Sequence, residues 1–180
     1  EKTYDVITLE PMPPTFAGVN ALYSKEFYEA ARAKMSAEGV IAQWLPIHLL
    51  SPYAATSITK TFRDVFPNAV LWQDPGSKTG IIMGTKNGQQ NIFKYFPGLK
   101  RTKIERTLSD EQSLEAFYLN AEELKSYSEA GALITDDNQL LAYGKASLAY
   151  RTGQDYNTAN QALMADIKAG TNQENTDEAK

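Results

Sequence analysis

The chain has 180 residues and a formal charge of −4, with 18 Lys and Arg against 22 Asp and Glu. It contains no cysteine and one histidine, His48, which excludes disulfides, thiolate metal sites, cysteine nucleophiles and histidine-rich zinc sites. Mild acidity without a basic cluster argues against binding to a nucleic-acid backbone, and no apolar run approaches the roughly 20 residues that span a bilayer. The composition predicts one soluble folded domain that makes no membrane contact itself.

The first half of the chain alternates strand and helix patterns. A β-branched run at 5–9 predicts a strand that ends at the proline-rich stretch 10–14. Residues 25–35 have helical spacing behind Ser24 as N-cap, and Gly39 is expected to close the turn before a second strand at 39–45.

The next segment continues the alternation. Ser51-Pro52 predicts a helix start, with a buried stripe running down to Phe66. Strands are predicted at 69–73 and 79–85, joined by the turn formers of 74–77, and the short connection requires the second of these to pair antiparallel. The order strand, helix, strand, helix, strand predicts an α/β fold with a mainly parallel sheet.

The second half of the chain is predicted to be mostly helical. Residues 86–107 are polar and irregular, with an edge strand expected around 102–108. Capping boxes at 109–112 and 120–123 predict two short helices, the second ending at Gly131. The remaining predictions are a turn at 134–138, a helical hairpin over 139–150 and 156–167 with stops at Gly153 and Gly170, and a disordered tail over 171–180.

Four blocks carry a family resemblance: YDVITLEPMPPTFAGVNALYSKEFYEAARAKMSAEGVIAQW, TFRDVFPNAVLW, GIIMGTKN and LITDDNQLLAYG. Together they resemble the second half of the spermidine synthase family, especially its bacterial branch fused to membrane domains. The match covers residues 3–86 and 114–144. The resemblance implies the C-terminal half of a doubly wound, methyltransferase-like sheet, with 1–108 as a partial α/β domain and 109–170 as a helical segment packing on it. The family transfers an aminopropyl group from decarboxylated S-adenosylmethionine to a polyamine amine.

The donor-binding loop of such a sheet has no counterpart in this chain. In that fold a glycine-rich loop after the first strand holds the nucleotide. No G-x-G-x-x-G motif is present, and the series Gly76, Gly80, Gly84 and Gly88 falls across a predicted strand and its turns. We therefore expect no cofactor to be bound by this chain alone, although the family uses decarboxylated S-adenosylmethionine as co-substrate.

Glu10 is the candidate catalytic residue. It follows the carboxyl end of a strand predicted to be parallel, where open α/β sheets bind their ligands. The resemblance implies that an acid at this position takes the proton from the attacking amine, and a carboxylate both attracts a cationic amine and accepts a proton. A second family acid falls at Pro13. The alternative is a solvent-facing glutamate at a strand end.

Four further residues are candidate substrate ligands. Gln43 matches a family glutamine near the substrate pocket, and His48 should emerge at the same sheet edge, although an isolated histidine is often a structural residue. Asp136 and Asp137 resemble the family's Thr-Asp-Asp segment and either cap the next helix or extend an acidic pocket, an alternative that Thr135 and Asn138 share. Trp44 and Trp72 are interpreted as core residues.

Two functions remain open from the sequence, so whether the chain is an enzyme stays uncertain. One is the polyamine-side half of a spermidine synthase-like aminopropyltransferase, inactive as an isolated chain. The other is a non-catalytic binding or assembly module with a methyltransferase-like fold. The expected partners are a polyamine or other small amine, and a second copy or a missing N-terminal half that covers an uncovered sheet edge. The expected location is cytoplasmic, with tethering to the inner membrane through upstream segments left open.

Overall fold

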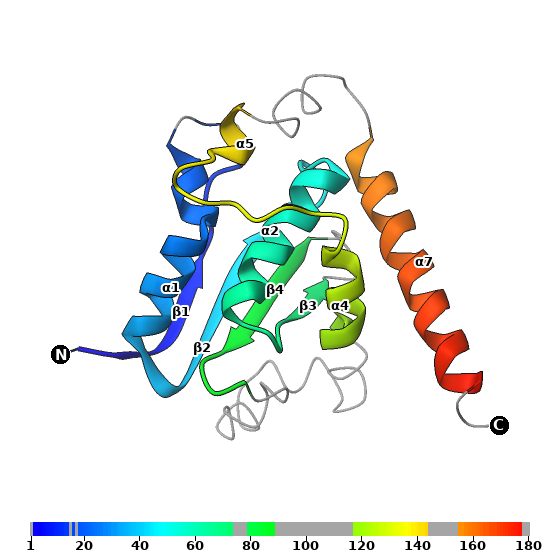
Figure 1. The fold of residues 1–180 in the computed structure, drawn as a ribbon, viewed down its shortest axis with the longest axis horizontal. Coiled ribbons are helices and arrows are strands. Elements are labelled where there is room, and N and C mark those ends of the chain that lie inside the picture. The colour runs from blue at the N-terminus through cyan, green and yellow to red at the C-terminus, as the bar shows by residue number, and fades with distance from the viewer. Residues whose placement is uncertain are drawn as a thin grey trace, which may run out of the picture.

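A five-stranded sheet organises the chain, with strand order β1-β2-β4-β3-β5 (Figure 1). The computed structural model describes residues 2–14, 16, 18–73, 79–88, 117–143 and 155–177. The strands are β1 Tyr4–Leu9, β2 Met35–Leu45, β3 Val70–Gln73, β4 Gly80–Thr85 and β5 Phe117–Leu119. The helices are η1 Val19–Tyr23, α1 Lys25–Lys34, α2 Pro52–Val65, α4 Ala121–Ser128, α5 Leu140–Tyr143 and α7 Tyr156–Asp177.

The sheet has mixed strand directions. β1 and β2 pair parallel, whereas β4 pairs antiparallel with both β2 and β3, and β5 pairs antiparallel with β3. β1, β2 and β3 therefore run in one direction, with β4 inserted between β2 and β3 against them. The predicted α/β class is confirmed, as is the antiparallel pairing of the strand predicted at 79–85. The insertion of β4 was not predicted, and it makes the hydrogen-bonded ladders mostly antiparallel.

Helix starts follow local capping signals that the sequence predicted. The Ser24 hydroxyl accepts a hydrogen bond from the backbone of Phe27, and the Ser51 hydroxyl accepts one from Ala54 with Pro52 at the first helical position. Asn120 and Glu123 form a complete capping box at the start of α4. Each cap satisfies backbone donors that the first helical turn leaves without partners.

The helices α1, α2 and α4 cover one face of the sheet (Figure 1). The stripe predicted for α2 is buried along its length, and Phe62 in its last turn packs edge-to-face against Tyr28 of α1 and contacts the tilted ring of Phe66. The segment after α4 lies across α2, since the backbone of Ala132 donates to the Ser57 hydroxyl at 3.0 Å. The core therefore sits between this helical layer and one side of the sheet.

The sheet edge formed by β1 is left open in the described chain. Tyr4 and Val6 of this strand are 44% and 47% exposed, and β1 pairs with β2 on one side only. α7 contacts α4 and α2, on the other side of the fold. The described part of the C-terminal region therefore does not cover the β1 edge.

Two glycines predicted to end helices do not do so. α1 ends at Lys34 and β2 begins at Met35, so Gly39 lies inside the strand. A Cβ on Gly39 would lie 3.0 Å from the carbonyl oxygen of Tyr4, so this glycine permits a close approach of β1 to β2. α7 runs through Gly170 to Asp177, and the backbone of 171–177, predicted as disordered, is helical.

Several predicted features fall outside the described residues. They are the turn 74–77, the edge strand at 102–108, the capping box at 109–112, Gly153, and the part of the first hairpin helix beyond α5. The turn predicted at 134–138 is present at 136–138, and α4 ends before Gly131 as predicted. Within the described residues, no helix combines the length and apolar character needed to cross a membrane.

Candidate amine-binding site

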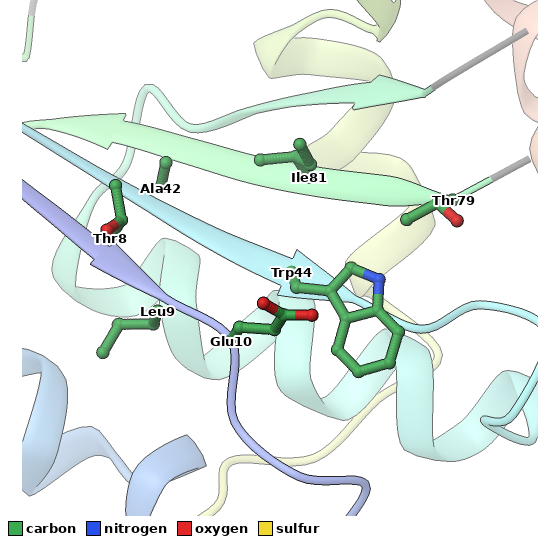
Figure 2. Close-up of a pocket in the computed structure, with 7 residues that line it drawn as sticks. All are labelled: Thr8, Leu9, Glu10, Ala42, Trp44, Thr79 and Ile81. Carbon is green, nitrogen blue, oxygen red and sulfur yellow. The ribbon is translucent and has the colours of Figure 1, made fainter.

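A pocket of about 560 Å³ lies where β1 and β2 end and β4 begins. Its lining residues come from all three strands and the chain next to them (Figure 2): Thr8, Leu9, Glu10, Ala42, Trp44, Thr79 and Ile81. Because β1 and β2 are parallel, their carboxyl ends lie at the same end of the sheet, and the antiparallel β4 has its amino end there. The pocket therefore lies at the carboxyl ends of the parallel strands, where open α/β folds bind ligands.

Strand register decides which side chains reach the pocket. Thr8 pairs with Ala42, and Trp44 pairs with Ile81, so these four residues form two cross-strand pairs on one face. Side chains alternate between the faces of a strand, and this face is the one turned away from α1 and α2. The floor of the pocket is thus a small apolar patch of the open sheet face, with a threonine hydroxyl at Thr8.

The carboxylate of Glu10 stands beside the indole of Trp44 at the pocket (Figure 2). Glu10 is exposed and has no ion-pair partner among the described residues. The chain that follows it is fixed, since the buried Tyr23 hydroxyl donates to the carbonyl of Met12 at 3.1 Å. A free carboxylate next to an aromatic face is a suitable site for an ammonium group, which both attract.

His48 lies at the rim of this site. Its ring centroid is 6.3 Å from that of Trp44, with the rings tilted by 54°. The imidazole is exposed and is not among the residues that line the pocket. The structure therefore brings His48 close to Trp44 without placing it on the pocket floor.

Gln43 points to the other face of the sheet. Its neighbours Ala42 and Trp44 line the pocket, whereas Gln43 is fully buried on the helical side. There it is close to Tyr28, whose pKa is raised by burial, an effect that the Gln43 amide partly offsets. Neither side chain makes a hydrogen bond of normal geometry within the described structure. Gln43 is therefore at the expected end of its strand but not beside Glu10.

Asp136 and Asp137 lie on the exposed turn before α5 and are not among the residues that line the pocket. Asn138 is the residue that organises this turn, because its side-chain oxygen accepts from the backbone of Thr135 and Leu140. The buried Asn20 anchors the turn by donating to the Thr135 carbonyl and accepting from Leu141. The structure does not bring the two aspartates together with Glu10.

Sequence reasoning missed Trp44, Thr8 and Thr79 as pocket residues. The signal for Trp44 was present, because a residue next to a buried Gln43 on a strand must face the opposite way. Thr79 depends on how β4 is inserted, which no local pattern encodes. Within the described residues, no group of three or more His, Cys, Asp or Glu side chains could hold a metal ion.

No family model matches the sequence. No curated protein matches it either. Among solved structures, the chain is similar to a spermidine synthase in complex with the transition state analogue AdoDATO, with 18% identity and a TM-score of 0.41. The likeness covers 59% of this chain and 39% of that chain, so this chain spans about two-fifths of the solved structure's length.

Proposed function

We propose that the pocket at the carboxyl ends of β1 and β2 binds the amine of a polyamine or similar small amine. The single observation that carries the proposal is the Glu10 carboxylate, without an ion-pair partner among the described residues, beside the Trp44 ring and above an apolar floor. The carboxylate attracts the ammonium head, the ring adds a cation–π attraction, and the apolar floor accepts a methylene chain. The sequence resemblance to the polyamine-side half of a spermidine synthase supports the same ligand class.

The proposed chemistry is proton removal from a bound amine. An ammonium has no lone pair, so it must lose a proton before its nitrogen can attack carbon. We assign Glu10 as the acceptor of that proton, because in the proposed complex the carboxylate that holds the ammonium is also its nearest base. In the proposed enzyme the nitrogen attacks the aminopropyl carbon that is bonded to the sulfonium of decarboxylated S-adenosylmethionine. The C–N bond forms as that C–S bond breaks, and the sulfur leaves with the bonding electron pair as a neutral thioether. The donor is held by residues other than those lining this pocket.

The second candidate function is a non-catalytic amine-binding or assembly module. Pro13, half-buried in the loop after Glu10, occupies the position of the family's second acid, which leaves one carboxylate among the described residues of the pocket. A single carboxylate can bind an amine without supporting transfer. The two functions differ in one measurable property, which is turnover.

Binding is tested by titrating the chain with putrescine in a calorimeter at low salt. We expect millimolar affinity, since an exposed ion pair contributes only about 0–1 kcal/mol and salt screens it. Glu10→Gln should weaken binding several-fold, by roughly the factor of five that 1 kcal/mol represents. Glu38→Gln is the matched control, because Glu38 is an exposed acid near the opposite end of β2.

Catalysis is tested by assaying aminopropyl transfer from decarboxylated S-adenosylmethionine to putrescine. This chain alone should give no product, whereas the full-length product of its gene should be active and should lose activity on Glu10→Gln. Full activity in that variant would end the assignment of Glu10 as the base. Amine binding without transfer by the full-length protein would favour the binding module.

A further inference from the structure

Asn160 of α7 is a buried polar side chain outside the pocket that makes several hydrogen bonds. It is fully buried, and its amide nitrogen donates to the carbonyl oxygens of Ile47 at 3.0 Å and Leu50 at 2.7 Å. The same nitrogen lies 3.0 Å from the carbonyl of Tyr156, one turn earlier in α7. Its amide oxygen accepts from the Tyr127 hydroxyl of α4 at 3.0 Å. One side chain thus joins α7, α4 and the turn between β2 and α2.

The two carbonyls held by Asn160 lie on either side of His48 in the sequence. The turn also follows directly after Trp44 and Leu45, the last residues of β2. His48 in turn stands against the Trp44 ring, with ring centroids 6.3 Å apart. The amide of Asn160 therefore fixes the backbone of the turn that carries His48 to the rim of the pocket.

Hydrogen bonds between buried polar groups restrict the backbone conformation of the segments that they join. An asparagine amide offers two donor hydrogens, so binding two carbonyls of one turn leaves that turn few alternative conformations. Loss of the donors would leave the carbonyls of Ile47 and Leu50 without these partners in a buried place, which favours rearrangement of the turn. α7 buries Tyr156, Asn160 and Met164 along one stripe, so the helix that supplies the contact is itself anchored by packing.

We propose that Asn160 is a positioning residue through which the C-terminal helix holds His48 against Trp44 at the rim of the amine pocket. The part concerning the amine rests on the proposed function. The part concerning the His48–Trp44 contact does not. Asn160 touches no ligand in this proposal, and its effect passes through the backbone of the turn at 46–50.

The direct test is the fluorescence of Trp44 in a Trp72→Phe background, where Trp44 is the single tryptophan. A protonated imidazole in contact with an indole quenches its fluorescence, so a pH titration of the Trp44 emission reports whether the two rings are in contact. Glu10 is the other titratable group beside Trp44 among the pocket residues, so Glu10→Gln is used to separate its contribution. We expect a pH-dependent fluorescence step that disappears in His48→Gln and remains in Glu10→Gln.

Asn160→Ala should reduce the step at least roughly twofold, at a temperature where circular dichroism shows the protein folded, because the turn loses the two hydrogen bonds that hold it. Asn157→Ala, one turn earlier on the same helix, is the matched control and should leave the step unchanged. If Asn160→Ala is not folded, Tyr127→Phe carries the test, since it removes only the bond to the amide oxygen and should reduce the step less.

An unchanged step in the folded Asn160 variant would overturn the proposal, as would a step that survives His48→Gln or is missing from the Trp72→Phe parent. The amine part is read from putrescine affinity, which should fall roughly two- to fivefold in Asn160→Ala. If the fluorescence step depends on Asn160 but putrescine does not bind the parent, the positioning role stands and the proposed function fails.

Discussion

Glu10 and Gln43 lie at the carboxyl ends of neighbouring parallel strands but on opposite faces of the sheet. Leu9 pairs with Gln43 across the β1–β2 ladder, and Glu10 follows Leu9. Glu10 lines the open pocket, whereas Gln43 is fully buried beneath α1 with Tyr28. The residue that shares the face of Glu10 is Trp44, the next along β2. The side chains that meet at the pocket are therefore the carboxylate of Glu10 and the ring of Trp44, and not the expected polar pair of Glu10 and Gln43.

Gln43→Leu should leave putrescine affinity unchanged within roughly twofold, because the side chain does not reach the pocket. The double variant Gln43→Leu, Tyr28→Phe should have a free energy of unfolding equal to that of the parent or up to about 1 kcal/mol higher. The reason is that the two substitutions remove buried polar groups that lack hydrogen bonds of normal geometry. Calorimetry measures the affinity, and urea denaturation measures the stability. A tenfold loss of affinity in folded Gln43→Leu would place Gln43 back in the ligand site.

Trp44→Leu should weaken amine binding roughly two- to fivefold, since a cation–π contact at an exposed site contributes about 0.5–1 kcal/mol. Trp44→Phe should recover part of the loss, because a phenyl ring retains the attraction in weaker form. Trp72→Leu is the control, since Trp72 is half-buried on β3 and is not among the residues lining the pocket. Equal losses in the Trp44 and Trp72 variants would indicate a general effect on the sheet.

Gly131→Ala should destabilise the fold by at least about 1–3 kcal/mol, as overpacking against an unyielding neighbour does. A Cβ at this position would lie 2.4 Å from backbone atoms of Thr56 and Ser57 in α2, which cannot move independently of the helix. Chemical denaturation measures the change. A stability equal to that of the parent would mean that the segment after α4 does not lie on α2 as described.

Gly170→Ala should have the opposite effect and stabilise α7 by roughly 0.5–1 kcal/mol. A Cβ there meets nothing within 4 Å, and the residue lies inside a helix that continues to Asp177. The melting temperature and the helical circular dichroism signal should both rise slightly. A loss of stability would indicate that Gly170 ends the helix, as its sequence context alone predicted.

The open edge of β1 should promote self-association. Unpaired strand edges with exposed apolar side chains form intermolecular ladders, and Tyr4 and Val6 are such side chains. Sedimentation velocity should show a concentration-dependent species larger than the monomer, and Val6→Lys should suppress it by placing a charge on the edge. A monodisperse monomer at high concentration, with no effect of Val6→Lys, would contradict this expectation.

The sequence predicted what is encoded locally. Ser24, Ser51-Pro52 and Asn120 each mark a helix start, because a cap needs only a side chain and the three residues after it. The prediction that Gly39 and Gly170 end helices was wrong, because a close strand approach and a continuing helix depend on distant neighbours. The insertion of β4 and the role of Asn160 are likewise long-range features. Glu10 lies at the carboxyl ends of the strands, where the sequence placed it, but Trp44 and not Gln43 shares its face, because neighbouring side chains of a strand point to opposite faces.

The most direct test of the account is a nuclear magnetic resonance titration of the ¹⁵N-labelled chain with putrescine, following the indole N–H of Trp44. We expect the Trp44 signal and the amides of Thr8 and Ala42 to shift together with one millimolar dissociation constant, while the Trp72 indole stays in place. In Glu10→Gln these shifts should shrink at matched amine concentration, and in Glu38→Gln they should persist. Shifts confined to other residues, or Trp44 shifts of equal size in Glu10→Gln, would contradict the assignment of this pocket as an amine site.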